Sequence, residues 1–247
     1  MPTNLSSKRL ATARLALLAT FFVQGIAAIT TLPRIPELIQ QIDVDFAQWG
    51  LIIGLSGLGS FASLVLSNKL VLRFGNTPVM KVSTVLVVSV IIAQGFITNA
   101  WLFFLVLIAQ SFTYSMFNIA LNSQAVRLQK RMGKVMLGSL HGAWSIGAAT
   151  SAAISGWLAS FLDLRVHLIL VMSLCGVAFW VASRFLLTNE EEGHNPETKP
   201  KHSVSWFETP GYLWLLAVGL FAGMWPELVM MDWSAVFSKE VLRSEER

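Results

Sequence analysis

Long stretches without a single charged residue dominate this chain of 247 residues. They cover residues 15–32, 46–68, 82–126, 135–162 and 166–183. A helix needs about 20 apolar residues to cross the hydrocarbon core of a bilayer, so these stretches predict membrane-spanning helices. We therefore expect an all-α membrane protein.

The number of spans follows from the interruptions. Residues 82–126 are twice the length of one span and are interrupted at Thr98, Asn99 and Ala100, which predicts two helices joined by a tight turn. A further apolar stretch runs from Pro210 to about residue 237. The sequence therefore predicts seven spans.

The composition excludes several classes of protein. Only 13% of the residues are charged, about half of the proportion in a soluble domain. Such a chain cannot cover a water-facing surface of this size, which argues against a soluble enzyme, a disordered chain or a disulfide scaffold. It has one cysteine, Cys175, which cannot form an internal bridge.

Lysine and arginine are distributed unequally between the loops. The N-terminus and the loops after the second, fourth and sixth spans hold most of them, whereas the opposite loops hold only Arg34 and Arg165. By the positive-inside rule, the chain is a multi-pass protein with a cytoplasmic N-terminus, and we place it in the plasma membrane. The net charge of +4 then reflects topology, and we expect no nucleic-acid partner.

The chain divides into three parts. Residues 1–187 form a six-helix transmembrane bundle, residues 188–209 form a polar cytoplasmic linker, and residues 210–247 hold the first helix of an incomplete second half. His194 and His202 in the linker are too far apart for a metal site. We expect no metal, no cofactor and no enzymatic activity, since no phosphate loop, metal motif or catalytic triad is present.

Small residues recur at intervals of four in the second and fifth spans. They predict close helix packing, because small side chains let helix backbones approach in a membrane. Gly138 and Gly142 could also serve helix sliding. The residues concerned are Gly50, Gly54, Gly57, Gly59, Ser63, Gly138, Gly142, Ala148, Ala152 and Gly156.

The loop after the second span, residues 68–76, reads NKLVLRFGN. With Arg73, Phe74 and Gly75 it resembles the loop G-x-L-a-D-r-x-G-r-k of the major facilitator superfamily. Asn68 replaces the first glycine and Leu72 replaces the acid, which helps to latch the cytoplasmic side in that family. The gate of this chain is therefore expected to work differently.

Three further segments resemble the fucose-permease-like and MosC-like branch of this superfamily. They are residues 118–122 (NIALN), residues 138–147 (GSLHGAWSIG) and residues 232–234 (DWS). The resemblance implies a secondary active transporter with two six-helix halves that work by alternating access. The chain matches one half and one further helix, so we expect it to be truncated after the seventh helix. Transport would then need a second half, from another chain or from a second copy.

Polar residues in the fourth span recur every four positions, which puts them on one slowly turning face. They either bond to neighbouring helices or face a water-filled cavity, which the fourth helix lines in the resembled family. Gln24 and Trp144 lie at a similar depth in the first and fifth spans. The predicted substrate-binding group is Gln24, Gln110, Tyr114, Asn118 and Trp144.

A second group is predicted to couple protons or to gate the path. Glu227 follows Pro226 in the last span, where a charge is costly and is retained for a partner or a function. It either couples proton movement or binds a polyol, unless it lies at the outer interface. His141 either links helices or titrates during transport, and Arg73 and Gly75 belong to the gating loop.

We expect the protein to transport a small polar organic solute across the membrane. In the favoured form of this prediction, the solute is sugar-like and its transport is coupled to protons. The partners expected are this solute and the lipid bilayer. The alternatives are a non-transporting structural or regulatory membrane protein, an inactive truncated fragment, and a channel.

Overall fold

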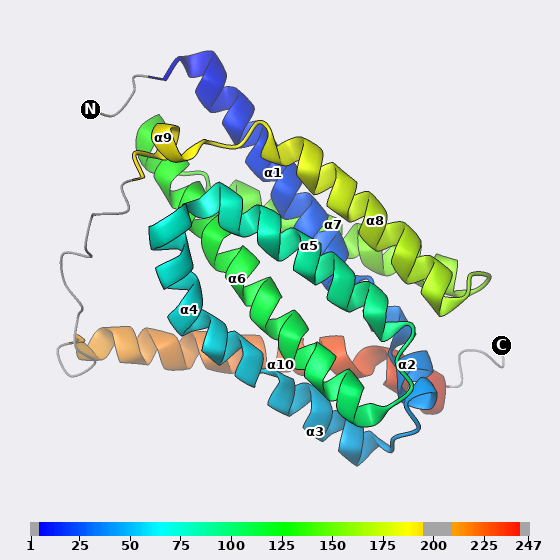
Figure 1. Cartoon of the computed structure of the whole chain (residues 1–247). Helices are drawn as coiled ribbons and strands as arrows, with labels where there is room; N and C mark the ends of the chain where they lie inside the picture. Colours follow the sequence, from blue (N-terminus) through cyan, green and yellow to red (C-terminus); the bar gives the residue numbers. More distant parts are fainter. Residues whose placement is uncertain (1–4, 195–208, 243–247) are drawn as a thin grey trace. The chain divides into compact units, whose positions relative to one another are not determined.

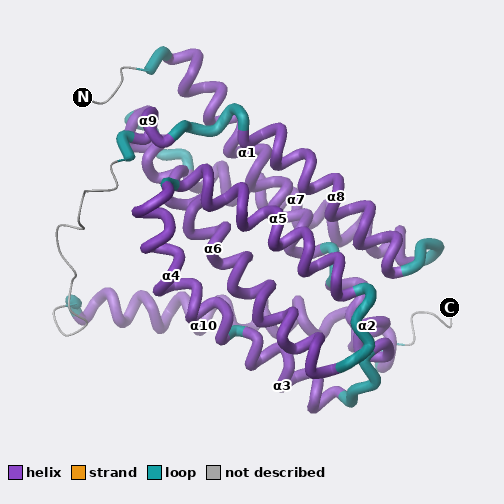
Figure 2. Tube along the Cα trace, viewed as in Figure 1, coloured by secondary structure: helices purple, strands orange, loops and turns teal. Residues whose placement is uncertain are grey.

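The computed structural model describes residues 5–194 and 209–242, and within these ranges every regular element is a helix (Figures 1 and 2). The chain divides into unit 1, Met1–Pro196, and unit 2, Glu197–Arg247. Each unit is described by itself. Most of the expected linker, including His202, lies outside the described residues.

Unit 1 is a bundle of long helices with short connections. Its elements are α1 (Ser7–Ile29), η1 (Leu32–Arg34), α2 (Ile35–Gln41), α3 (Phe46–Ser56), α4 (Leu58–Phe74), α5 (Asn76–Gln94), α6 (Ala100–Met132), α7 (Leu137–Ala159), α8 (Leu164–Ser183) and α9 (Asn189–Glu192). We call the end that holds residues 5–9, 74–77, 127–137 and 184–194 the basic end. The other end, with residues 30–48, 94–100 and 158–167, is the opposite end.

The helix boundaries follow from local chemistry. The Ser6 hydroxyl accepts a hydrogen bond from the Arg9 backbone N–H, and the Asn99 side chain accepts one from the Leu102 N–H. Both residues thus satisfy backbone donors at a helix start. Gly133, with φ of +62°, ends α6 in the left-handed conformation that glycine adopts without strain.

Six helical segments among the described residues are long and apolar enough to cross a membrane. They are Ser7–Gln41, Phe46–Phe74, Asn76–Gln94, Ala100–Met132, Leu164–Ser183 and Gly211–Glu240. The remaining expected span, the fifth in the sequence, is present as α7, whose 23 residues cover about 35 Å. α7 contains many glycine, alanine, serine and threonine residues. Its mean hydropathy is therefore lower than that of the other spans, although it contains no charged residue.

α1 lies along α7, and α6 lies along both α4 and α5. α8 packs against α1 and α5. Three glycines permit the closest crossings: a Cβ on Gly25 would overlap the α7 backbone at Trp144, one on Gly147 would overlap Phe22 of α1, and one on Gly59 would overlap Ile108 of α6.

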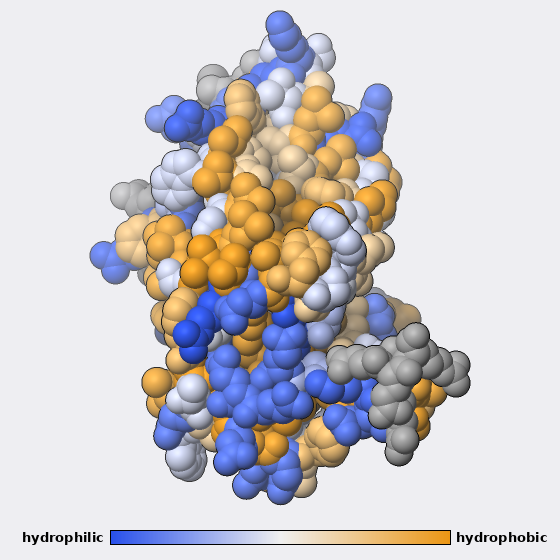
Figure 3. All heavy atoms as spheres, turned by 90° about the vertical axis from the view of Figure 1, so that its right-hand side faces the viewer, coloured by the Kyte–Doolittle hydropathy of each residue, from blue (hydrophilic) through white to orange (hydrophobic). Residues whose placement is uncertain are grey.

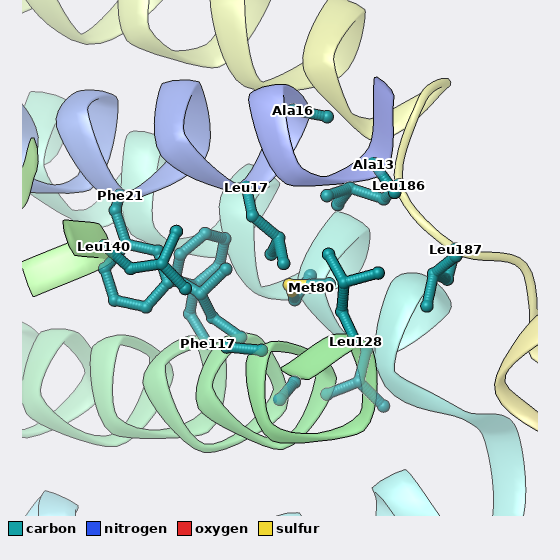
Figure 4. Close-up of a cluster of buried hydrophobic side chains, with 14 of the residues drawn as sticks. Ala13, Ala16, Leu17, Phe21, Met80, Phe117, Leu128, Leu140, Leu186 and Leu187 are labelled. Atoms are coloured by element: carbon teal, nitrogen blue, oxygen red, sulfur yellow. The ribbon is translucent and has the colours of Figure 1, made fainter. Parts of the chain in front are cut away.

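The hydrophobic core joins α1, α5, α6 and α7 and is shown in Figure 4. Leu17, Met80, Leu128 and Leu140 are fully buried there. Leu186 and Leu187, which follow α8, extend this core to the basic end. The core therefore ties the segment before α9 to the bundle.

Apolar side chains also cover much of the outer surface, as one face in Figure 3 shows. Exposed large apolar residues occur on all the long helices of unit 1, for example Phe61, Trp101 and Trp157. Contiguous apolar surface of this extent is unfavourable in water, so it is the surface that a lipid bilayer covers.

In unit 2 the structure describes one long helix, α10 (Gly211–Glu240), of 30 residues. Pro226 lies inside it and removes one backbone donor.

Candidate functional site

The middle of unit 1 brings polar side chains of α1 and α6 together. Gln24 of α1 is 5% exposed, and its Nε2 donates to Oδ1 of Asn118 on α6 at 3.5 Å. Asn122 lies one turn further along α6, and its Nδ2 donates to the same oxygen at 2.7 Å. Two amide donors therefore fix the Asn118 carbonyl.

This arrangement leaves the other half of the Asn118 amide free. The side chain is exposed, and its Nδ2 donates to no other residue in the part of the chain that the structure describes. An amide group held at its oxygen presents its two N–H donors in a defined direction. Asn118 is thus suited to donate hydrogen bonds to a polar solute.

A second pair joins α6 to α7. The side chains of Trp144 on α7 and Tyr114 on α6 lie close together, and both residues are partly buried. One turn nearer the basic end, the exposed His141 packs edge-on against Phe21 of α1, with 5.4 Å between ring centroids. α7 therefore adds an aromatic surface and an imidazole beside the amides.

The cavity beneath this polar group is too small for a solute. A cavity of about 30 Å³ lies beneath the amides and is lined by Gln24, Tyr114, Thr84 and Cys175, among others. That volume suits a water molecule. The exposed side of the group, where Asn118 and His141 lie, is open to larger molecules.

Gln110 lies outside this group. It accepts a hydrogen bond from Nε2 of Gln94 on α5, so its side chain serves the α5–α6 contact. Four of the five residues of the predicted substrate-binding group thus lie where α1, α6 and α7 meet, and Gln110 does not.

At the basic end, the predicted gating residue Arg73 lies in the last turn of α4, and Gly75 lies between α4 and α5. Arg73 is exposed, and its guanidinium carbon lies 5.2 Å from the ring centroid of Phe74. Gly75 has φ of +88°, and Asn189 of α9 fills the space that a side chain on Gly75 would need. Nδ2 of Asn189 donates to the Phe74 carbonyl at 2.8 Å. This loop is therefore the surface on which α9 docks.

α9 belongs to the segment expected to be a solvated linker, and the structure places it against the bundle. The Glu192 carboxylate is buried, where it accepts hydrogen bonds from Gln124 Nε2 and from Asn76 Nδ2, the latter at 2.7 Å. Arg127 Nε lies 3.8 Å from the same carboxylate. The first residues of the expected linker, up to Glu192, thus contact the bundle.

A second ion pair holds α9 to α1. Arg9 Nε donates to Oε1 of Glu191 at 2.7 Å, and its Nη2 donates to Oε2 at 2.5 Å. The same guanidinium donates to the carbonyls of Phe185 and Leu186. Arg9 thus clamps the chain between α8 and α9.

The two carboxyls of α9 respond to their surroundings in opposite ways. Burial raises the pKa of Glu192, and the hydrogen bonds from Gln124 and Asn76 together with the nearby Arg127 and Arg131 oppose this rise. The hydrogen bond from Arg9 holds the pKa of Glu191 below its ordinary value.

The sequence does contain a signal for α9 that hydropathy misses. Thr188 and Glu191 form a capping box, in which each side chain bonds the other residue's backbone N–H. A Thr followed three positions later by Glu is the usual pattern for a helix start. Its partners, however, lie more than 60 positions away in the sequence.

Glu227 lies in α10, directly after Pro226, and its side chain is exposed. The structure therefore gives the position of Glu227 within α10, the helix of unit 2. Within residues 5–194 and 209–242, no three His, Cys, Asp or Glu side chains gather closely enough to hold a metal ion.

The sequence matches the family model of the Major Facilitator Superfamily over residues 17–244. It is 26% identical over 239 residues to an uncharacterized transporter of Sinorhizobium fredii, covering 97% of this chain and 62% of that protein. It is 24% identical over 220 residues to an uncharacterized MFS-type transporter of Yersinia pestis, covering 88% of this chain and 55% of that protein. The chain thus spans less than two thirds of the length of both curated relatives. No solved structure matches it.

Proposed function

We propose, from the premise that this chain belongs to the Major Facilitator Superfamily, that it supplies one solute-binding half of a secondary active transporter. The chain is a multi-pass membrane protein, and both curated relatives are named as transporters. In the proposal, two halves rock about a site near the middle of the bilayer. The second half comes from another chain or from a second copy of this one.

The observation that carries this proposal is the group formed by Gln24, Tyr114, Asn118 and Trp144. Three helices contribute to it, and it leaves amide N–H donors and an aromatic surface exposed. A purely structural contact would have no need of an exposed donor, because both partners would be satisfied within the bundle.

The chemistry of this group favours a small neutral solute rich in hydroxyls, such as a sugar. Residues 15–32, 101–126 and 135–162 contain no Lys, Arg, Asp or Glu, so no fixed charge is available to bind an ion. Amides both donate to and accept from hydroxyl groups, and an indole ring packs against the apolar face of a sugar. The segments resembling the fucose-permease-like and MosC-like branch support the same class.

We assign proton coupling to Glu227 or His141, and gating to the loop with Arg73 and Gly75. A carboxyl at the centre of a membrane helix is costly and is retained for a function. The distribution of Lys and Arg supports a cytoplasmic N-terminus, with the basic end facing the cytoplasm, and we place the protein in the plasma membrane.

Binding of neutral solutes to the purified chain tests this proposal. A ligand that binds only the folded state stabilises it by about 2.7 kcal/mol at a hundred times its dissociation constant. We expect a sugar or polyol from a panel of neutral and charged solutes to raise the unfolding temperature of the wild type. Asn118→Ala should abolish this shift, and Gln110→Ala should keep it.

The alternative functions predict different experimental results. A non-transporting structural or regulatory protein, or an inactive fragment, would show no solute-dependent stabilisation with any member of the panel. A channel would conduct in reconstituted membranes without saturation and without competition between related solutes. Either result would contradict the proposal.

A further inference from the structure

A fully buried arginine joins three helix ends at the opposite end of unit 1. Arg34 of η1 is 1% exposed, and each of its three guanidinium nitrogens donates a hydrogen bond. Nη2 donates to the carbonyls of Leu158 and Leu162, at 3.3 Å and 2.7 Å. These carbonyls lie at the end of α7, where a helix leaves its last acceptors unpaired and where a cation is favourable.

The remaining nitrogens bind two further groups. Nη1 donates to both carboxylate oxygens of Glu37, at 2.7 Å and 3.0 Å. Nε donates to Nδ1 of His167 on α8 at 3.0 Å, and His167 is completely buried. Arg34 thereby holds the corner between α1 and α2 against the end of α7 and the start of α8.

This contact fixes the protonation state of His167. A guanidinium has donors only, so Nδ1 must offer its lone pair, and the imidazole must be neutral with its proton on Nε2. Nε2 lies 3.2 Å from Oγ1 of Thr30, which lies 3.2 Å from Oγ of Ser155. Hydrogen bonds are therefore donated in one direction, from Arg34 to His167 and from His167 to Thr30.

None of the charged groups near the imidazole is available to pair with a second positive charge, on the ring itself. Arg34 is in direct contact, and Glu37, which is 41% exposed, binds Arg34. On α8 itself, Asp163 accepts from the Arg165 backbone N–H, while the Arg165 guanidinium donates to the Gly95 carbonyl and lies over the ring of Phe96. From α1 and α7 come only the hydroxyls of Thr30 and Ser155.

We propose that His167 is a proton-binding site at the opposite end of unit 1, and that its protonation breaks the Arg34 contact and frees the end of α7. The protonated ring has no lone pair at Nδ1 and would place two cations 3.0 Å apart in a buried position. Arg34 is then drawn towards the partly exposed Glu37, and the Leu162 carbonyl loses the donor that Arg34 provides, whereas the Leu158 carbonyl keeps its backbone donor, the Leu162 N–H. The inference requires no solute and is independent of the proposed transport.

Hydrogen exchange of the purified chain in detergent tests the consequence. Rates for the amides of residues 158–167 are compared at about pH 7.5 and about pH 4, after correction for the intrinsic effect of pH. The range extends to about pH 4 because burial beside Arg34 disfavours the charged ring. We expect exchange of these amides to rise by about tenfold or more at the lower pH, as for loss of a hydrogen bond to a charged group. The amides of α6 should not change.

Two variants separate this site from other titrating groups. His167→Asn keeps an oxygen acceptor near the position of Nδ1 but cannot bind a proton there, so its exchange should not depend on pH. His141→Asn, which alters an exposed histidine, should keep the wild-type response. An equal pH response in the wild type and in His167→Asn, or no response in the wild type, would overturn the proposal.

A spectroscopic measurement on the wild type needs no variant to fold. Nitrogen NMR of chain labelled at histidine distinguishes the neutral forms from the doubly protonated ring. At neutral pH we expect His167 to carry its proton on Nε2 alone, and to gain the second proton together with the rise in exchange. A ring that is doubly protonated at neutral pH would refute the inference.

Discussion

Gly25 of α1 and Gly147 of α7 lie at the same helix crossing, and each is pressed against the main chain of the other helix. A Cβ at Gly25 would overlap the Trp144 carbonyl, and a Cβ at Gly147 would overlap the Phe22 carbonyl. The two glycines thus allow the backbones of α1 and α7 to touch. The same crossing places Gln24 and Trp144, their neighbours in the sequence, beside α6.

Gly25→Ala and Gly147→Ala should each destabilise unit 1. A methyl group cannot fit without separating the helices, and overpacking of this kind costs about 1–3 kcal/mol. Thermal unfolding of the purified chain measures the effect. Gly142→Ala, on a part of α7 where nothing lies within 4 Å of the added Cβ, is the control and should be neutral or stabilising. Equal effects at all three positions would show that the crossing is not tight.

Gly75→Ala should release α9, whereas Gly133→Ala should not. Both glycines have positive φ, at +88° and +62°, so both substitutions carry a backbone penalty. It is about 1–2 kcal/mol for the left-handed Gly133 and about 1–3 kcal/mol for Gly75, whose ψ of 168° is also unfavourable for other residues. Only at Gly75 does another residue, Asn189, fill the space of the new side chain. Hydrogen exchange of residues 188–193 should therefore rise in Gly75→Ala alone. A similar rise in both variants would assign the effect to strain in the loops.

Docking of α9 should depend on pH through Glu192. Its pKa is raised in the folded protein by burial, so docked α9 binds the proton more tightly than released α9 does. The contribution of Glu192 to docking is therefore largest at or below the ordinary glutamate pKa of about 4.3 and is lost as the pH rises through the raised value. Glu192→Gln should remove this loss, as read from hydrogen exchange of residues 188–193 across the pH range.

Glu191 should show the opposite sign. Its pKa is lowered by the hydrogen bond from Arg9, so its contribution is present above the ordinary glutamate pKa and is lost as the pH falls through the lowered value. Glu191→Gln should flatten the acid side of the docking profile and leave the neutral side unchanged. The reverse pattern in the two variants would contradict the assignment of both carboxyls.

Tyr114 and Trp144 should be energetically coupled. Tyr114→Phe and Trp144→Phe each alter the contact between the two side chains, so the double variant should be less destabilised than the sum of the single variants by about 1 kcal/mol. Thermal unfolding of the four proteins measures this coupling. Tyr212→Phe changes an exposed tyrosine and serves as the control. Strict additivity would show that the contact contributes nothing.

The positions of the long helices could be read from the sequence, because a span requires an uncharged segment of a fixed length. The C-terminal end of α6 could not be predicted in this way. The fourth span was expected to end near residue 126, but α6 continues through Arg127 and Arg131 to Met132. At about 50 Å it is longer than the roughly 30 Å hydrocarbon core, and its charged last turns can lie in water, where hydropathy gives no signal.

Rotation about the helix axis explains what sequence spacing missed in the site and in the packing. Four residues advance an α-helix by about 400°, so two such steps turn the face by about 80°. Gln110 is two steps from Asn118 and faces α5 instead. Likewise Gly138 and Gly142 share the spacing of small residues, but the crossing uses Gly147.

The polar clusters at the two ends escaped prediction for a different reason. Asn76 and Glu192 are 116 positions apart, and Arg34 and His167 are 133 positions apart. Nothing local in the sequence marks such pairs. The contacts arise only after the helices have packed.

The docking of α9 has a consequence for the order in which the protein is made. Synthesis begins at the N-terminus, and α9 is the last element of unit 1 to leave the ribosome. Its partners Arg9, Gly75, Asn76 and Gln124 come from helices inserted earlier. α9 can therefore find its place only after those helices have assembled, so its docking is the last step in completing unit 1.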